Sequence, residues 1–177
     1  MSADTVYKEV LTWAGEFDSE FAACLASQQE LSRAALAIGR GGKKPRKDFA
    51  VWSEVRGYMG FFFDELFRIE DAYPEKFTPE LIRAALSAFL TTYDPADEQS
   101  VWFDKIKAVA DSLGFASDMK AYRAAPEQYS GNVADVSMFL RIAVTGKQNS
   151  PDMYEVMRVL GAERVRARIA AMIEKLG

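Results

Sequence analysis

Residues 131–161 read GNVADVSMFLRIAVTGKQNSPDMYEVMRVLG, and this stretch decides the fold. In its first half, apolar residues recur three and four positions apart between Val136 and Ala143, with Arg141 on a different face. That spacing predicts an amphipathic helix. Gly146 is a fitting stop for this helix, because glycine tolerates the left-handed backbone found after many helix ends.

The second half of the stretch predicts another helix after a tight corner. Ser150 is a fitting N-cap, and Pro151 is a fitting first helical residue. The corner is expected to expose residues 145–150 beside Arg141 and a helix N-terminus. Free backbone N–H groups and the positive end of a helix dipole favour an anionic ligand such as a phosphate.

The rest of the chain shows the same helical spacing, with no alternating strand pattern, which predicts an all-α fold. Helices are expected over residues 4–17, 19–26, 29–38, 50–67, 78–93, 96–113, 117–124 and 162–176. In the last of these, the charged residues Arg164, Arg166, Arg168 and Lys175 are expected to lie mostly away from the apolar face. The segment 71–77 is the best boundary. We therefore expect two packed helical subdomains, residues 1–74 and 75–177.

Residues 39–48 interrupt the helical pattern with three glycines, one proline and five basic side chains. A solvated flexible loop and a phosphate-contacting RNA element both fit this composition. A nucleotide-binding P-loop is disfavoured, because no strand precedes the segment and Pro45 stands where Ser or Thr is needed. Downstream, Trp52 and Tyr58 belong to an apolar run that predicts a buried helix, although aromatic residues near cations can also stack on bases.

Composition excludes several classes of function. The 177 residues include no histidine, which removes imidazole-based catalytic triads and the commonest zinc sites. The single cysteine, Cys24, excludes an internal disulfide and suits a reducing cytoplasm, where we expect it to be a small buried side chain. No stretch of 18 apolar residues exists, so no membrane span is expected. A net charge of −4 restricts any nucleic-acid surface to a local patch.

Five motifs carry a family resemblance that runs through nearly the whole chain. They are GGKKPRKD at 41–48, WFDKIK at 102–107, LRIAVTG at 140–146, SPDMYEVM at 150–157 and VLGAERV at 159–165. In this order and spacing they resemble the C-terminal anticodon-binding region of bacterial glutamyl-tRNA synthetases. The resemblance implies a helical bundle or cage that recognises the anticodon stem-loop of tRNA for glutamate.

The resemblance also implies roles for particular residues. Arg141 stands where the family presents an arginine to an anticodon base. Ser150, Pro151 and Met153 match its loop-and-helix contacts, with Ser150 where many relatives carry threonine and Met153 where leucine is common. Thr145, in the same corner, completes this set. Phosphate contacts in the first subdomain are expected from Lys44, Arg46 and Lys47.

Catalysis is expected to depend on sequence outside these residues. The histidine-containing nucleotide signature of class I synthetases is absent, and so is a Lys-Met-Ser-Lys-Ser-like loop. We therefore expect no catalytic residue, metal site or cofactor in this chain. ATP and magnesium would belong to the catalytic domain of the same synthetase, which would be its second partner. Neither DNA nor a membrane is an expected partner.

Two other functions stay open at this point. A helical protein–protein adaptor would require a contiguous exposed apolar patch. A small helical enzyme could use paired carboxylates, but the pairs Glu16 with Glu20 and Glu65 with Glu70 have poor spacing and no histidine to support a metal.

Overall fold

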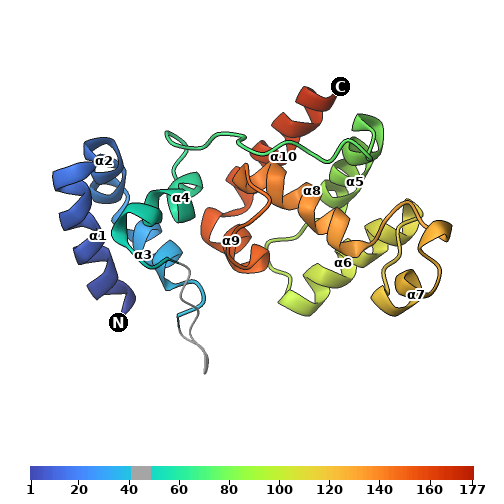
Figure 1. Cartoon of the computed structure of the whole chain (residues 1–177), viewed down its shortest axis with the longest axis horizontal. Helices are drawn as coiled ribbons and strands as arrows, with labels where there is room; N and C mark the ends of the chain where they lie inside the picture. The colour runs from blue at the N-terminus through green and yellow to red at the C-terminus, as the bar shows by residue number, and fades with distance from the viewer. Residues whose placement is uncertain (41–48) are drawn as a thin grey trace. The chain divides into compact units, whose positions relative to one another are not determined.

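A computed structural model describes residues 1–40 and 49–177 (Figure 1). These residues form helices joined by turns, and an isolated bridge between Ala116 and Asn132 stands in place of a sheet. The predicted all-α class is confirmed. In the described part of the chain, no helix combines the length and apolar character needed to cross a membrane.

Packing divides the chain into two compact units. Unit 1 comprises Met1–Arg68 and Asn149–Leu160, and unit 2 comprises Ile69–Gln148 and Gly161–Gly177. This grouping differs from the expected subdomains 1–74 and 75–177, because residues 69–74 pack with unit 2 and a late helix packs with unit 1. Whether residues 1–74 and 75–177 fold as separate domains stays a prediction.

The helices of unit 1 come from both ends of the sequence. They are α1 (Ala3–Phe17), α2 (Ser19–Ser27), α3 (Gln29–Ala37), α4 (Val55–Met59) and α9 (Met153–Leu160), with 3-10 turns η1 (Trp52–Glu54) and η2 (Gly60–Phe62). The first three helices pack on one another, and α9 packs on α3. The helices expected over 4–17, 19–26 and 29–38 are confirmed within one residue at each end.

The apolar run at 50–67 does not form the single helix that was expected. It is divided into η1, α4 and η2, after which Phe63 has an extended backbone. Phe61, Phe62 and Phe63 are all buried, at 4%, 0% and 0% exposure. Consecutive residues of an α-helix point about 100° apart, so one regular helix could not bury all three against a small core. The short turns allow this burial.

Arg56 on α4 holds the corner between α1 and α2. Its Nη1 donates to both carboxylate oxygens of Asp18, at 2.8 and 2.9 Å, and its Nη2 donates to Glu20 at 2.6 Å. These hydrogen bonds raise the pKa of the Arg56 guanidinium. Cys24 lies nearby and is buried, as expected. Burial first, and then the carboxylates of Glu65 and Glu20, raise the pKa of its thiol.

Unit 2 is built from helices that pack around an aromatic core. They are α5 (Pro79–Thr92), α6 (Gln99–Ser112), α7 (Met119–Ala124), α8 (Val133–Thr145) and α10 (Ala162–Leu176), with the 3-10 turn η3 (Pro126–Gln128). Contacts link α5, α6, α8 and α10 (Figure 1). Phe139 of α8 meets Phe77 and Phe115 edge-on, with ring centroids 4.9 and 5.9 Å apart.

Local capping explains where the main helices of unit 2 begin. The Thr78 hydroxyl accepts the N–H of Leu81, which confirms the predicted start of α5. Asn132 and Asp135 form a reciprocal capping box at the start of α8. Gly131 precedes it at a close approach, because a Cβ there would lie 2.8 Å from the Phe115 ring.

Arg168 of α10 is buried rather than solvated, contrary to expectation. It is 7% exposed, and its Nη1 donates to the carbonyl oxygen of Val144 at 2.9 Å. Val144 lies in the last turn of α8, where carbonyl groups have no helical partner. The guanidinium therefore satisfies one of these carbonyls, which is why a charged side chain occupies this buried position.

We expect Arg168→Met to destabilise the protein. Methionine fills similar space but donates no hydrogen bond, so a buried carbonyl loses its partner, at a cost of about 2 kcal/mol. The free energy of unfolding from urea titrations measures the loss. Arg166→Met is the matched control, because Arg166 is exposed on the same helix and bonds the Tyr93 carbonyl at 3.1 Å. An equal loss for both variants would contradict the role assigned to Arg168.

Candidate nucleic-acid interface

The end of α8 forms the tight corner predicted from the sequence. Gly146 adopts φ +78°, and its N–H donates to the Ile142 carbonyl at 2.8 Å. A side chain at this φ would be strained, so glycine is required here. The predicted stop at Gly146 is confirmed.

Thr145 is buried beside this glycine, so the expectation that the corner exposes it is wrong. Its side chain is 0% exposed. Its Oγ1 donates to the Arg141 carbonyl at 2.7 Å and accepts the N–H of Lys147 at 3.2 Å. A hydroxyl with this placement ties the last turn of α8 to the residue after the corner.

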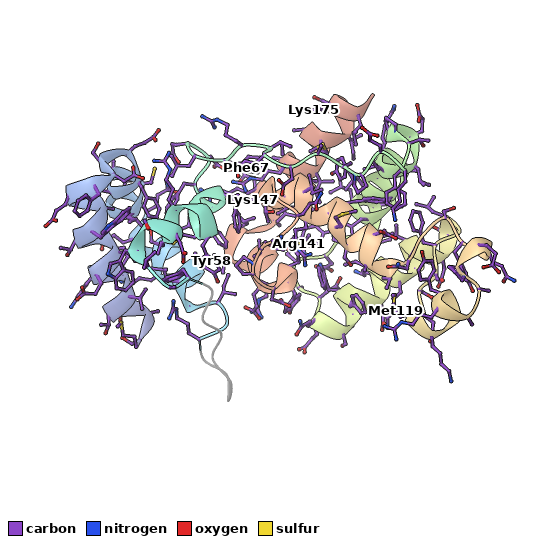
Figure 2. The ribbon with its side chains drawn as sticks, viewed as in Figure 1. Tyr58, Phe67, Met119, Arg141, Lys147 and Lys175 are labelled. Carbon is purple, nitrogen blue, oxygen red and sulfur yellow. The ribbon has the colours of Figure 1, made fainter. Side chains whose placement is uncertain are left out.

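The segment 69–73, called the strap below, crosses the corner. The backbone N–H groups of Glu70 and Asp71 both donate to the Gly146 carbonyl, at 2.9 and 3.0 Å. A carboxylate oxygen of Asp71 accepts the N–H of Gln148 at 2.7 Å, and the Glu70 carboxylate lies 3.2 Å from Lys147 Nζ. Figure 2 marks Lys147 at this place. The strap thus binds the corner through both backbone and side chains.

Tyr73 extends this attachment to the middle of α8. Its hydroxyl donates to the Phe139 carbonyl at 2.9 Å, and its ring packs edge-on against the Phe139 ring. Burial raises the pKa of the Tyr73 hydroxyl well above its ordinary value. The hydroxyl therefore remains protonated and can donate this hydrogen bond across the physiological range.

Arg141 is the side chain of this part of α8 that keeps access to solvent. Within residues 139–146, all of them described, the other positions are buried and Arg141 is half-buried. In the first turn of the same helix, Asp135 caps α8 and lies 3.8 Å from Lys76. The apolar stripe predicted for this helix is confirmed, because all four of its members are buried: Val136, Phe139, Leu140 and Ala143.

The start of α9 differs from the prediction. Helix α9 begins at Met153, and the Asp152 carboxylate accepts the N–H of Glu155 at 3.1 Å, so Asp152 is the cap in place of Ser150. An ionised carboxylate pairs better with the helix dipole than a hydroxyl does. This carboxylate also puts a negative charge where a phosphate was expected, which disfavours that anion site.

The predicted contacts in this second segment are mostly buried. Pro151 and Met153 have little exposed surface. Ser150 is half-buried, and its hydroxyl donates to the Pro151 carbonyl at 2.9 Å. The structure places Arg141 and Thr145 in unit 2 but Ser150, Pro151 and Met153 in unit 1. The remaining predicted contacts, Lys44, Arg46 and Lys47, lie outside the described residues.

Sequence reasoning missed two features. On α9, the guanidinium of the exposed Arg158 lies 5.6 Å from the ring centre of Tyr154, and this spacing of four residues could have indicated the pair. The strap bonds could not be found in this way, because Asp71 and Gln148 are 77 positions apart.

The two other functions receive no support from these contacts. Glu20 is paired with Arg56 and Glu70 with Lys147. Across residues 1–40 and 49–177, no cluster of three or more acidic or cysteine side chains could hold a metal. An adaptor would need a continuous apolar patch. Among the described residues, the large exposed apolar side chains are spread along the sequence, with two of them, Val101 and Phe103, on the same helix α6; the others are Met1, Phe17, Val51 and Ile69.

We expect Asp71→Ala to loosen the corner. The variant loses the acceptor for the Gln148 N–H, and the cost should be about 1 kcal/mol for this half-buried carboxylate. That change corresponds to a fall of roughly 2–4 °C in Tm. Asp71→Asn keeps an acceptor oxygen and should retain most of the stability, and Glu75→Ala is an exposed control. If the Tm of Asp71→Ala equals that of the wild type, the Asp71 side chain does not stabilise the corner.

Comparison with known proteins identifies the family. The model of the anticodon binding domain family matches residues 44–173. The chain is 46% identical over 175 residues to a glutamate–tRNA ligase of Sorangium cellulosum, covering 98% of this chain and 31% of that relative. It is 38% identical over 171 residues to a glutamate–tRNA ligase of Acetivibrio thermocellus, covering 97% of this chain and 31% of the relative.

A third relative, a glutamate–tRNA ligase of Clostridium perfringens strain 13, is 38% identical over 173 residues and is covered over 32% of its length. The chain therefore spans about a third of the length of these curated relatives. The resemblance expected from the motifs is confirmed. Because the family match extends over most of its residues, the chain belongs to the anticodon-binding domain family.

Proposed function

We propose that this chain binds the anticodon stem-loop of tRNA for glutamate, as the anticodon-binding part of a glutamate–tRNA ligase. The match of residues 44–173 to the anticodon binding domain family carries the proposal. The choice of tRNA for glutamate rests on the names of the relatives, because each of the three is a glutamate–tRNA ligase. Activation of glutamate, with its ATP and magnesium, is assigned to the parts of such a ligase that these residues do not match.

Arg141 is the residue proposed to read a base. Its neighbours in α8 are buried, so the helix holds the backbone of Arg141 firmly while the side chain keeps access to solvent. A planar guanidinium forms directional hydrogen bonds to the edge of an unpaired base, which a lysine imitates poorly. The half-buried hydroxyl of Ser150 is proposed as a second polar contact.

The other predicted contacts are proposed to act differently from one another. Thr145, Pro151 and Met153 are buried, which favours a role in shaping the backbone near the RNA over direct hydrogen bonding. Lys44, Arg46 and Lys47 are proposed to neutralise phosphates, since five cations in ten residues are a local excess in a chain of net charge −4.

The phosphate role is tested by replacing Lys44, Arg46 and Lys47 together with alanine. Binding should weaken about equally for all RNA sequences, and the plot of log affinity against log salt should flatten by roughly one unit for each lost phosphate contact. Fluorescence anisotropy at several salt concentrations measures both quantities. Unchanged affinity and slope would mean that these residues belong to a solvated loop.

The base-reading role is tested with Arg141→Lys and Arg141→Ala. Both substitutions should weaken binding of the stem-loop of tRNA for glutamate by on the order of 1–3 kcal/mol. The loss should be larger for Arg141→Ala than for Arg141→Lys. A stem-loop with a changed anticodon should lose much less, because it never made the contact. Titrations of both RNAs, with melting curves of each variant, measure the difference.

The opposite outcome has a clear meaning. If Arg141 only braces the helix, both stem-loops will weaken alike and Tm will fall. Equal losses for the two RNAs would therefore show that Arg141 does not recognise a base. The proposal that the chain binds RNA would still stand.

A further inference from the structure

Four side chains of unit 1 form a surface cluster that the proposed contacts do not use. The Phe49 ring lies 6.2 Å from the Trp52 ring and 5.4 Å from the Tyr58 ring, between ring centres. The Arg40 guanidinium lies over the same Phe49 ring, 5.2 Å from its centre. We call these four residues the aromatic platform. Figure 2 labels Tyr58, which comes from α4.

Backbone and side-chain contacts hold the platform in place. Nε of Arg40 donates to the Leu36 carbonyl at the end of α3, which orients the guanidinium. Before η1, the carboxylate of Glu54 accepts the Ala50 N–H at 2.7 Å, which fixes the turn that carries Trp52. The carboxylate of Glu54 is thus engaged by the backbone. These contacts are made within the protein itself, so the cluster is preorganised and does not need a ligand to form.

The platform is less buried than the core beside it. Phe49, Trp52 and Tyr58 are each half-buried, whereas Val55 and Met59 of the same segment are completely buried. Phenylalanine is among the residue types most often buried completely, so the half-buried Phe49 departs from a purely core role. The platform instead keeps aromatic area in contact with water, next to a cation.

We propose that the aromatic platform binds an unpaired base of the RNA by stacking. This inference rests on the proposed function and adds a contact in unit 1, separate from Arg141 in unit 2. Aromatic faces and guanidinium planes are the groups on which single-stranded bases stack, whatever the base. Charge supports an RNA occupant, since the sequence that joins Arg40 to Phe49 carries four further cations.

The test compares two RNAs and one substitution. Trp52→Ala should weaken binding of an RNA hairpin with a seven-base unpaired loop by about 5- to 150-fold, the range measured for loss of one stacked base. A blunt RNA duplex with the same stem offers no unpaired base, so its affinity should be unchanged. Stacking involves no phosphate, so the salt slope for the hairpin should also stay unchanged.

Two further variants separate stacking from folding. Trp52→Phe keeps a stacking ring and should recover most of the affinity. Trp13→Ala is the matched control, because Trp13 is a half-buried tryptophan of unit 1 that packs on Phe17 and lies outside the platform. It should bind both RNAs like the wild type. AMP at millimolar concentration should not displace the hairpin, because a lone nucleotide lacks the remaining RNA contacts.

The outcomes separate the two proposals. Full hairpin affinity in Trp52→Ala would overturn the platform and leave the proposed function standing. Equal losses for hairpin and duplex, or no recovery in Trp52→Phe, would also overturn it, because they indicate a structural role. If the wild type binds neither RNA, the proposed function fails and the platform fails with it.

Discussion

The carbonyl oxygen of Gly146 accepts two backbone N–H groups, from Glu70 and Asp71, and the attachment of the strap to the end of α8 depends on this junction. It requires the left-handed backbone of Gly146, which directs the carbonyl away from the helix that it ends. The strap then reaches Lys147 and Gln148 through its own side chains. One glycine therefore determines the end of α8, the path of the strap and the backbone after the corner.

The same region shows how carbonyl groups near a buried helix end find hydrogen-bond partners. The Arg141 carbonyl is bonded by the Thr145 hydroxyl, the Val144 carbonyl by Arg168, and the Gly146 carbonyl by the strap. Each partner comes from a different element. A helix held in this way has little freedom to shift, so a side chain such as Arg141 loses less entropy when it binds a ligand.

Features controlled by neighbouring residues could be predicted from the sequence, and those controlled by distant residues could not. The start of α5 at Thr78 and the stop at Gly146 depend on local backbone chemistry, and both were found. The buried placement of Arg168 depends on a carbonyl 24 positions away, and the apolar run at 50–67 is divided into short elements that its apolar composition did not indicate. The predicted cap Ser150 was wrong by two positions, because the carboxylate of Asp152 accepts the N–H of Glu155 and begins α9 instead.

The course of the chain through unit 1 has a consequence for synthesis on the ribosome. Unit 1 takes α9 from after most of unit 2, and α9 packs on α3, which is made much earlier. The surface of α3 that α9 covers therefore stays uncovered while more than a hundred further residues are synthesised. Contacts of such long separation slow folding and leave apolar surface open to aggregation or to chaperones. The N-terminal helices cannot complete their native packing until α9 has left the ribosome.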